Sequence, residues 1–399
     1  MIPERVERRA CWVLATLGAH DVRLGHELPY DAGAWEQVDR GERPGDELAD
    51  AFFHLARIEE RSGPRDRHGR FPASATCLDL LDPPLERLRR RLGIEPPRWR
   101  GGRFAVALTH DVDVPWRWTR RGVTRATRRV AHHVRAGHGR AALREARIVA
   151  TIPGHKLRRT DPNWRFDRIL ALEGERGASS TFFVMAGHAH PEDGPEPQVY
   201  ARLRPRLIRT LTAGGAEVGL HPSYTAADDE ERLAREKRAL EALAGPVAGQ
   251  RYHFLRVDPH RNLAPLARLG FSYDASLGFA AAPGFRAGIA HPFRPWDLAA
   301  DRALDLVEIP LAAMDTTFGS GQYLGLSAAA AEGPLFDLVD RAAEHGGGFA
   351  LLWHSGRFDG ATAAGWDRLY ERLLAAIGDR GGVCLTAGAL AEEAAAWLR

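Results

Sequence analysis

Two carboxylates that follow an apolar run are the residues best suited to chemistry in this 399-residue sequence. Residues 104–113 read Phe-Ala-Val-Ala-Leu-Thr-His-Asp-Val-Asp, a run typical of a strand buried on both faces. Because side chains at i and i+2 of a strand project to the same side, we expect Asp111 and Asp113 together at its carboxyl end. Two like charges that close repel each other unless a cation or a proton lies between them. The pattern predicts a metal site, a shared proton or both; the simpler alternative is a pair of acids that only cap the strand.

Apolar runs and helical patterns alternate along the rest of the chain. The expected further strands are 180–185, 216–220, 304–311, 348–353 and 383–386. The expected helices are 166–176, 201–213, 228–244, 334–345 and 365–379, each ending at or shortly before a glycine. Strands that alternate with helices of this length indicate βα units and a parallel sheet, here with enough units to close a barrel. Barrel enzymes hold their chemistry at the carboxyl ends of such strands.

Six short motifs occur in a fixed order, each at the end of an expected strand. They are Leu-Thr-His-Asp-Val-Asp at 108–113, Ser-Thr-Phe-Phe-Val at 180–184, Glu-Val-Gly-Leu-His at 217–221, Phe-Ser-Tyr-Asp-Ala-Ser at 271–276, Val-Glu-Ile-Pro at 307–310 and Leu-Leu-Trp-His at 351–354. In this order they resemble the polysaccharide deacetylases of the NodB-homology type, over roughly residues 100–399. The resemblance implies an α/β fold: a distorted (β/α) barrel of about seven units, preceded here by a small α/β N-terminal domain.

The resemblance also implies a reaction and a set of roles. Its members remove an acyl group, usually acetyl, from an amino sugar or glycan, using a divalent metal held by one Asp and two His. Carried over by position, Asp113 and His221 are the metal ligands, Asp111 is the general base and His354 is the general acid. Zinc is the expected metal, and Mn, Co or Ni also suit such ligands.

The sequence departs from the family pattern at three places. Thr225 stands where a second histidine is expected, so the third metal ligand is open. The candidates for it are His110, His253, His260 and Asp111. The arginine motif has two competing matches, one ending at Arg256 and one at Arg286, and Arg256 is the catalytic candidate. Ser355 follows His354 where an Asp is common.

Four further side chains near strand ends are predicted to contact substrate. They are Tyr224, His253, Asp274 and Trp353. Each has a structural alternative, because Asp274 can equally orient its neighbours and Trp353 can pack in the core.

The chain divides into two predicted parts, a small N-terminal domain over 1–97 and the barrel over 98–399. The first part holds an expected helix at 46–60, a polar turn at 66–71 and a helix at 85–92, and it resembles the small domain that precedes the barrel in one bacterial subgroup. Three widely spaced cysteines argue against disulfides and against a cysteine metal site. Because neither a signal peptide nor a membrane-length apolar run is present, we expect a cytoplasmic protein.

Residues 116–165 are strongly basic, with fourteen Arg and Lys against two acids. A basic helical segment next to the Asp111 strand suits a polyanion, a carrier-linked glycan or an anionic membrane surface; the alternative is a solvated insertion. Nucleic acid is not expected, since aromatic side chains do not interleave the basic ones. Besides deacetylation, hydrolysis of another C–N bond on a small molecule and a glycan-binding barrel without activity remain open.

Overall fold

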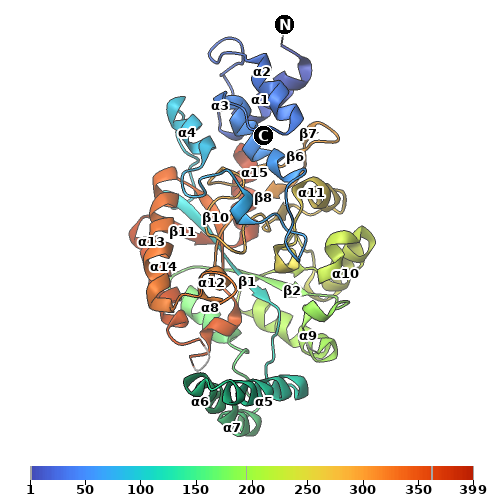
Figure 1. Cartoon of the computed structure of the whole chain (residues 1–399), viewed down its shortest axis with the longest axis vertical. Coiled ribbons are helices and arrows are strands. Elements are labelled where there is room, and N and C mark those ends of the chain that lie inside the picture. Colours follow the sequence, from blue (N-terminus) through green and yellow to red (C-terminus); the bar gives the residue numbers. More distant parts are fainter. Residues whose placement is uncertain (1, 195, 361–362, 399) are drawn as a thin grey trace.

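Nine parallel strands form one curled sheet in the computed structural model, which describes residues 2–194, 196–360 and 363–398. The strand order is β8-β5-β4-β3-β2-β1-β10-β9, with β11 also paired to β1. Figure 1 shows the strands in the middle of the molecule with helices around them. The strands are β1 (Phe104–Val112), β2 (Thr181–Met185), β3 (Glu217–His221), β4 (Gly249–Gln250), β5 (Tyr273–Asp274), β8 (Val307–Glu308), β9 (Leu311–Met314), β10 (Gly348–Leu352) and β11 (Gly382–Leu385). The predicted distorted barrel is confirmed.

Helices surround the sheet. They are α8 (Phe166–Gly174), α9 (Pro197–Ala213), α10 (Glu230–Ala244), α11 (Pro259–Arg268), α13 (Ala328–His345), α14 (Trp366–Asp379) and α15 (Ala387–Trp397). Five of these were predicted, with ends that differ by up to six residues, and α11 and α15 were not predicted. One expected strand, 304–311, is in fact two strands, β8 and β9, separated by Ile309 and Pro310. The proline lacks an N–H and cannot continue a sheet ladder.

Strand β1 is the centre of the sheet, and all nine of its residues are buried. Its first half pairs with β11 and its second half with β2, while β10 lies along its other edge. Because every pairing is parallel, the carboxyl ends of β1, β2, β3 and β10 point the same way. The motifs at those ends therefore meet on one side of the barrel.

The first 97 residues form helices where strands were also expected. These are α1 (Glu4–Thr16), α2 (Ala32–Arg40), α3 (Glu47–Leu55) and α4 (Pro84–Arg91), and a lone bridge between Leu24 and Leu28 is the only extended pairing within the described part of this region. The α/β expectation for it is wrong, because the stretches between the helices are polar and proline-rich. The expected helix 46–60 ends at Leu55, since Arg57 adopts a φ of 53°.

Buried contacts join these N-terminal helices to the barrel. Trp12 packs against Trp296 with ring centroids 5.0 Å apart. Arg286, the second match to the arginine motif, binds Glu60 through Nη2 at 2.6 Å, and both side chains are 1 % exposed. Burial opposes ionisation of Glu60, but Arg286 and Arg57 lower its pKa to about 2. Arg286 therefore has a structural role at this junction.

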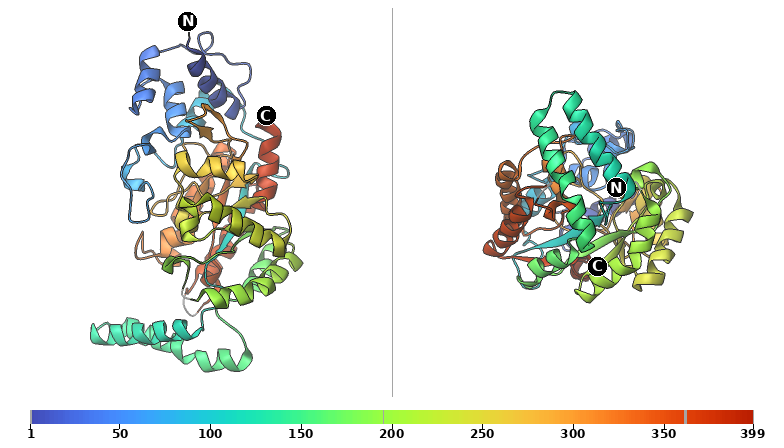
Figure 2. Two further views of the ribbon diagram at one scale, coloured as in Figure 1. Left: turned by 90° about the vertical axis from the view of Figure 1, so that its right-hand side faces the viewer. Right: turned by 90° about the horizontal axis from the view of Figure 1, so that it is seen from below.

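The basic segment 116–165 folds into an arm of three helices, α5 (Arg120–Arg135), α6 (Gly139–Ala150) and α7 (Ile152–Arg158). Figure 2 shows the arm at the end of the molecule opposite to the N-terminal helices. Across the described residues, no helix combines the length and the apolar character that crossing a bilayer requires.

Candidate active site

The predicted catalytic and metal-binding residues converge at the carboxyl ends of the central strands. Asp111 and Asp113 lie at the end of β1, His221 ends β3 and His354 follows β10. All four line one cavity of about 200 Å³. The structure therefore brings together the four residues that the sequence placed at strand ends.

His253 completes a cluster with two of these residues, here called the Asp113 cluster (Asp113, His221 and His253). Nε2 of His221 lies 3.2 Å from Oδ1 of Asp113 and 2.9 Å from Nδ1 of His253. Nδ1 of His253 lies 3.5 Å from the same carboxylate oxygen. One ligand atom of each residue falls within 4.8 Å of the others, which is the spacing of a metal site.

The hydrogen bonds of both imidazoles leave lone pairs facing this point. His221 is 2.7 Å from the carbonyl oxygen of Arg251 through Nδ1, and His253 is 3.1 Å from that of Glu192 through Nε2. A neutral imidazole has a single N–H, and a carbonyl can only accept, so each N–H points outward. Oδ1 of Asp113 is buried and receives no well-aligned donor. Two nitrogens and one carboxylate oxygen without donors fit a divalent cation such as zinc.

The electrostatics of the cluster also favour a cation. Burial opposes ionisation of Asp113, yet the imidazoles of His221, His253 and His354 hold its pKa well below its usual range. Burial works against a charged His221, but the carboxylates of Asp111 and Asp113 raise its pKa. For His253 burial prevails, and its pKa is lowered. A positive charge between the two carboxylates, from a proton or a metal ion, stabilises this arrangement.

Of the other candidates for the third ligand, Asp111 lies beside the cluster, with Oδ2 3.9 Å from Nε2 of His221, and the two histidines lie elsewhere. His110 points to the opposite side of β1 from Asp111, with Nε2 2.8 Å from Glu173 and Nδ1 2.6 Å from the carbonyl of Trp353. His260 bonds the carbonyl of Arg57 near the N-terminal helices. His253, predicted both as a possible ligand and as a substrate contact, is therefore the third member of the cluster.

The side chain of Arg251 binds Asp111, the predicted general base. Its Nη1 donates to Oδ1 of Asp111 at 3.1 Å and to Oγ1 of Thr109 at 2.7 Å, while Nε donates to the carbonyl of Ala275 at 2.8 Å. The guanidinium lies over the ring of Phe183 at 4.6 Å. With these contacts the side chain fixes the carboxylate of Asp111 toward the cavity.

Arg251 thus occupies the place predicted for Arg256. Nε of Arg256 donates to the carbonyl of His68 at 2.9 Å, Nη1 donates to the carbonyl of Tyr224, and Nη2 pairs with Asp228 at 2.7 Å. These bonds fasten the loop after β3 and leave Arg256 out of the cavity lining. The sequence gives little sign of Arg251, because the strand before it, β4, has two residues.

Asp315, a carboxylate outside the six sequence motifs, raises the pKa of His354. Oδ1 of Asp315 lies 2.6 Å from Nδ1 of His354, and Oδ2 accepts from Arg357. Burial alone would lower the pKa of His354, but Asp315 raises it to about 9. The imidazole is therefore protonated at neutral pH, with Nε2 3.7 Å from Oδ2 of Asp113. Asp315 follows the short strand β9, so an apolar run ending in an acid was its only sequence signal.

Two predicted substrate contacts are buried away from the cavity. Asp274 is fully buried and accepts from Gln250 and from Ser276. Trp353 is fully buried and packs against Trp366 and Tyr370, at centroid distances of 5.6 and 5.3 Å. Both predictions are wrong, because each side chain projects into the packed layer beside its strand.

Tyr224 lies near the cavity without lining it. Its hydroxyl is 3.0 Å from Nδ1 of His68, and its ring stacks on that of His190 at 4.5 Å. The polar turn at 66–71 instead contributes Arg70 to the cavity wall. Arg70 donates to Asp66 and to the carbonyl of Phe254 at 2.8 and 2.7 Å. The N-terminal region therefore forms part of the site.

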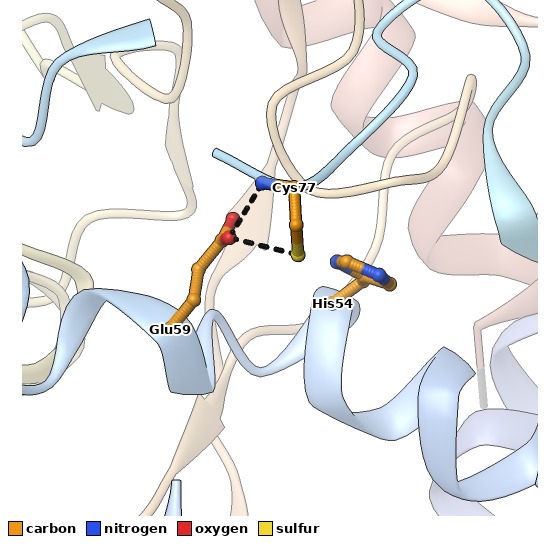
Figure 3. Close-up of side chains that lie close together, drawn as sticks. All are labelled: His54, Glu59 and Cys77. Atoms are coloured by element: carbon orange, nitrogen blue, oxygen red, sulfur yellow. Dashed lines mark hydrogen bonds between the residues drawn. The ribbon is translucent and has the colours of Figure 1, made fainter. Parts of the chain in front are cut away.

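A second group of metal-binding residue types lies at the N-terminal helices, here called the Cys77 cluster (His54, Glu59 and Cys77; Figure 3). Both oxygens of Glu59 already accept hydrogen bonds. Oε1 accepts from Arg57 and Thr76, each at 2.6 Å, and Oε2 from N and Sγ of Cys77 at 3.1 and 3.3 Å. The donor set of this cluster suits a metal less well, because a guanidinium already neutralises its carboxylate.

Comparison with known proteins adds a likeness of fold. No protein-family description matches the sequence, and no curated protein matches it. Among solved structures, a Mycobacterium smegmatis protein described as a polysaccharide deacetylase is similar, with 21% identity and a TM-score of 0.48 over 75% of this chain and 93% of that one. A Pseudomonas aeruginosa PAO1 protein of the same description has 18% identity and a TM-score of 0.47 over the same shares. At these identities the likeness concerns the fold alone.

Proposed function

We propose that this protein is a metal-dependent hydrolase that removes an acetyl group from an amino sugar or glycan. The observation that carries the proposal is the Asp113 cluster, in which three ligand atoms face one point without donors. Beside it lie a carboxylate fixed by Arg251 and an imidazole kept protonated by Asp315. The family resemblance of the sequence motifs supports the same reaction.

Each residue takes one role in that reaction. The Asp113 cluster would hold a divalent cation, which would polarise the acyl carbonyl and make the attacking water more acidic. Asp111 accepts a proton from the attacking water, and Arg251 keeps the carboxylate turned toward it. His354 donates its Nε2 proton to the leaving amine nitrogen, so that the amide and water become acetate and a free amine. After each turnover the proton that Asp111 took from water passes to solvent, His354 takes one up from solvent, and the carboxylate of Asp315 stabilises the charged imidazole.

Release of acetate from N-acetylglucosamine oligomers tests the proposal. We expect protein loaded with zinc to release acetate and to leave free amines in equal amounts. Activity on small cyclic amides but not on acetylated sugars would assign the site to another C–N bond. Binding of oligomers without acetate release, at full metal loading, would leave a glycan-binding barrel.

A further inference from the structure

The arm (116–165) is built so that its surface is almost purely cationic. Its two acids both serve internal contacts. Glu145 is 8 % exposed and faces Arg129 at 3.4 Å, and Asp161, at 1 % exposed, accepts the backbone N–H groups of Arg117, Trp118 and Asn163. The exposed arginines therefore have little compensating charge on the arm itself.

A small core of its own holds the arm together. Trp118, Ala126, Ile148 and Ile152 are buried against one another, with α5 packed along α6. Since this core is formed by the opposite face of α5, the arginine face is held in one orientation.

One face of α5 forms a wall of a groove of about 1030 Å³. Arg125, Arg128 and His132 lie along it at spacings of three and four residues, which places them on one side of the helix. Residues 188–191 line the other wall. None of the described residues that line the groove is acidic, and no ion pair involves Arg125 or Arg128 within the described chain.

The groove lies beside the catalytic cavity. The crevice between them shares His188 and Gly194 with the groove and Asp113 with the cavity, but it holds only about 20 Å³ and is also lined by Asp193 and Glu196. A chain molecule whose acyl group lies at Asp113 therefore meets the cationic groove with units further along the chain, beyond this crevice.

We infer that the groove binds the anionic part of an acidic glycan, so that the substrate carries carboxylate or phosphate groups several units from the reacting acetyl group. This inference rests on the proposed function only for the end of the substrate that carries the reacting acetyl group. Binding of anionic units in the groove does not depend on that reaction. A concave surface beside the cavity suits a chain better than a flat bilayer. Val134, Leu143 and Leu157 are exposed on the arm, so contact with an anionic membrane is the competing outcome that the test separates.

Binding of defined oligosaccharides to the full-length protein tests the inference without turnover. The probes are tetragalacturonate, which carries carboxylates, inorganic pyrophosphate as a phosphate competitor, and neutral chitotetraose. We expect tetragalacturonate to bind more tightly than chitotetraose. Its affinity should fall at least about tenfold between about 0.01 M and about 0.15 M salt, since the screening length shortens from about 30 Å to about 8 Å. Displacement by pyrophosphate would show that phosphate groups are accepted as well as carboxylates; carboxylate binding alone would narrow the substrate to uronic-type glycans.

A matched pair of double variants separates the groove from the general charge of the arm. R125Q/R128Q removes two charges from the groove, and R140Q/R144Q removes two from exposed positions of α6 that do not line it. Glutamine keeps helix propensity nearly level. We expect the first pair to weaken tetragalacturonate binding about tenfold or more and the second about threefold or less, as for screened surface charges. R125K/R128K should keep most of the wild-type affinity for tetragalacturonate. That result would show that R125Q/R128Q binds weakly because it lacks the charges and not because it misfolds.

Two results would overturn the inference. One is an equal loss in both pairs, together with binding to phosphatidylglycerol vesicles but not to phosphatidylcholine vesicles, which would assign the arm to a membrane. The other is wild-type protein with no salt-dependent affinity for tetragalacturonate or pyrophosphate. If acetylated sugars are not hydrolysed but the groove still binds tetragalacturonate through Arg125 and Arg128, the proposed reaction fails and the anion site stands.

Discussion

The Asp113 cluster and the Cys77 cluster contain similar residue types but differ in what already occupies their lone pairs. In the Asp113 cluster, both imidazole N–H groups are directed outward to backbone carbonyls, and the ligand atoms face one another without donors. In the Cys77 cluster, the carboxylate of Glu59 accepts four hydrogen bonds, one of them from Arg57. Residue type and proximity alone therefore do not identify a metal site; the surrounding donors decide it.

The positions of the two clusters also favour the Asp113 cluster as the metal site. The Asp113 cluster lies at the carboxyl ends of central strands, next to a cavity and to His354, whose pKa Asp315 raises to about 9. The Cys77 cluster lies where the N-terminal helices end, and its burial and Glu59 raise the pKa of the Cys77 thiol to about 11. A metal binds the thiolate, so binding at Cys77 has to displace a proton that the neighbouring Glu59 carboxylate stabilises. The contrast predicts that metal content follows the first cluster only.

Removing the carboxylate of the Asp113 cluster should have the largest effect. Asp113→Ala deletes one of three ligands, and the two remaining imidazoles are too few to hold the metal stably. We therefore expect metal content to fall from about one ion per chain to a small fraction, with activity at background. Elemental analysis of protein purified without chelator measures it. Unchanged metal content in this variant would mean that the Asp113 cluster does not hold the metal, against the contrast drawn between the two clusters.

Changing the base should separate chemistry from metal binding. Asp111→Asn keeps the shape of the side chain and its contact with Arg251, so metal content should stay level while turnover falls about 10²–10⁴-fold. The two measurements are made on the same preparation. If the metal is lost instead, Asp111 is a ligand and the Asp113 cluster has four members.

A smaller, more specific effect is expected from Asp315→Asn. The carboxylate of Asp315 keeps His354 protonated below a pKa of about 9, so the acid form is lost as pH rises through that value. Without the charge the pKa falls, and the alkaline limb of turnover should move about 1–3 pH units lower. Rate profiles at equal metal loading check this. An alkaline limb that does not move would mean that another group protonates the leaving amine.

The sequence predicts best where strands are long. Strand β1 is a nine-residue apolar run, so its position and the two acids at its end could be read directly. His221 ends one five-residue strand, His354 lies just beyond another, and both were found in the same way. Each lies where a buried strand reaches the barrel mouth.

The residues that the sequence did not assign depend on short strands and distant contacts. Arg251 follows a strand of two residues, and Asp315 follows one of four. His253 was named from the sequence, but only as one of four candidates for the third ligand and as a substrate contact; it precedes Phe254, which adopts a φ of 58°, so neither periodicity nor strand polarity places its ring. The early end of α3 likewise depends on Arg57, whose partner Glu60 is held by Arg286 from far along the chain.

The smallest effect is expected at the second cluster. Cys77→Ser keeps a donor toward Glu59 and removes the sulfur, so we expect metal content to equal that of the wild type. The free energy of unfolding should change by no more than about 0.5 kcal/mol, as for most exposed positions. Elemental analysis and thermal unfolding, run beside Asp113→Ala, measure the two quantities. The opposite result is a wild type that holds a second equivalent of zinc and a Cys77→Ser variant that has lost it. It would show that zinc binding at the Cys77 cluster releases more free energy than displacing Arg57 from Glu59 costs. The two clusters would then both be metal sites, and the arrangement of donors would no longer explain why the Asp113 cluster is favoured.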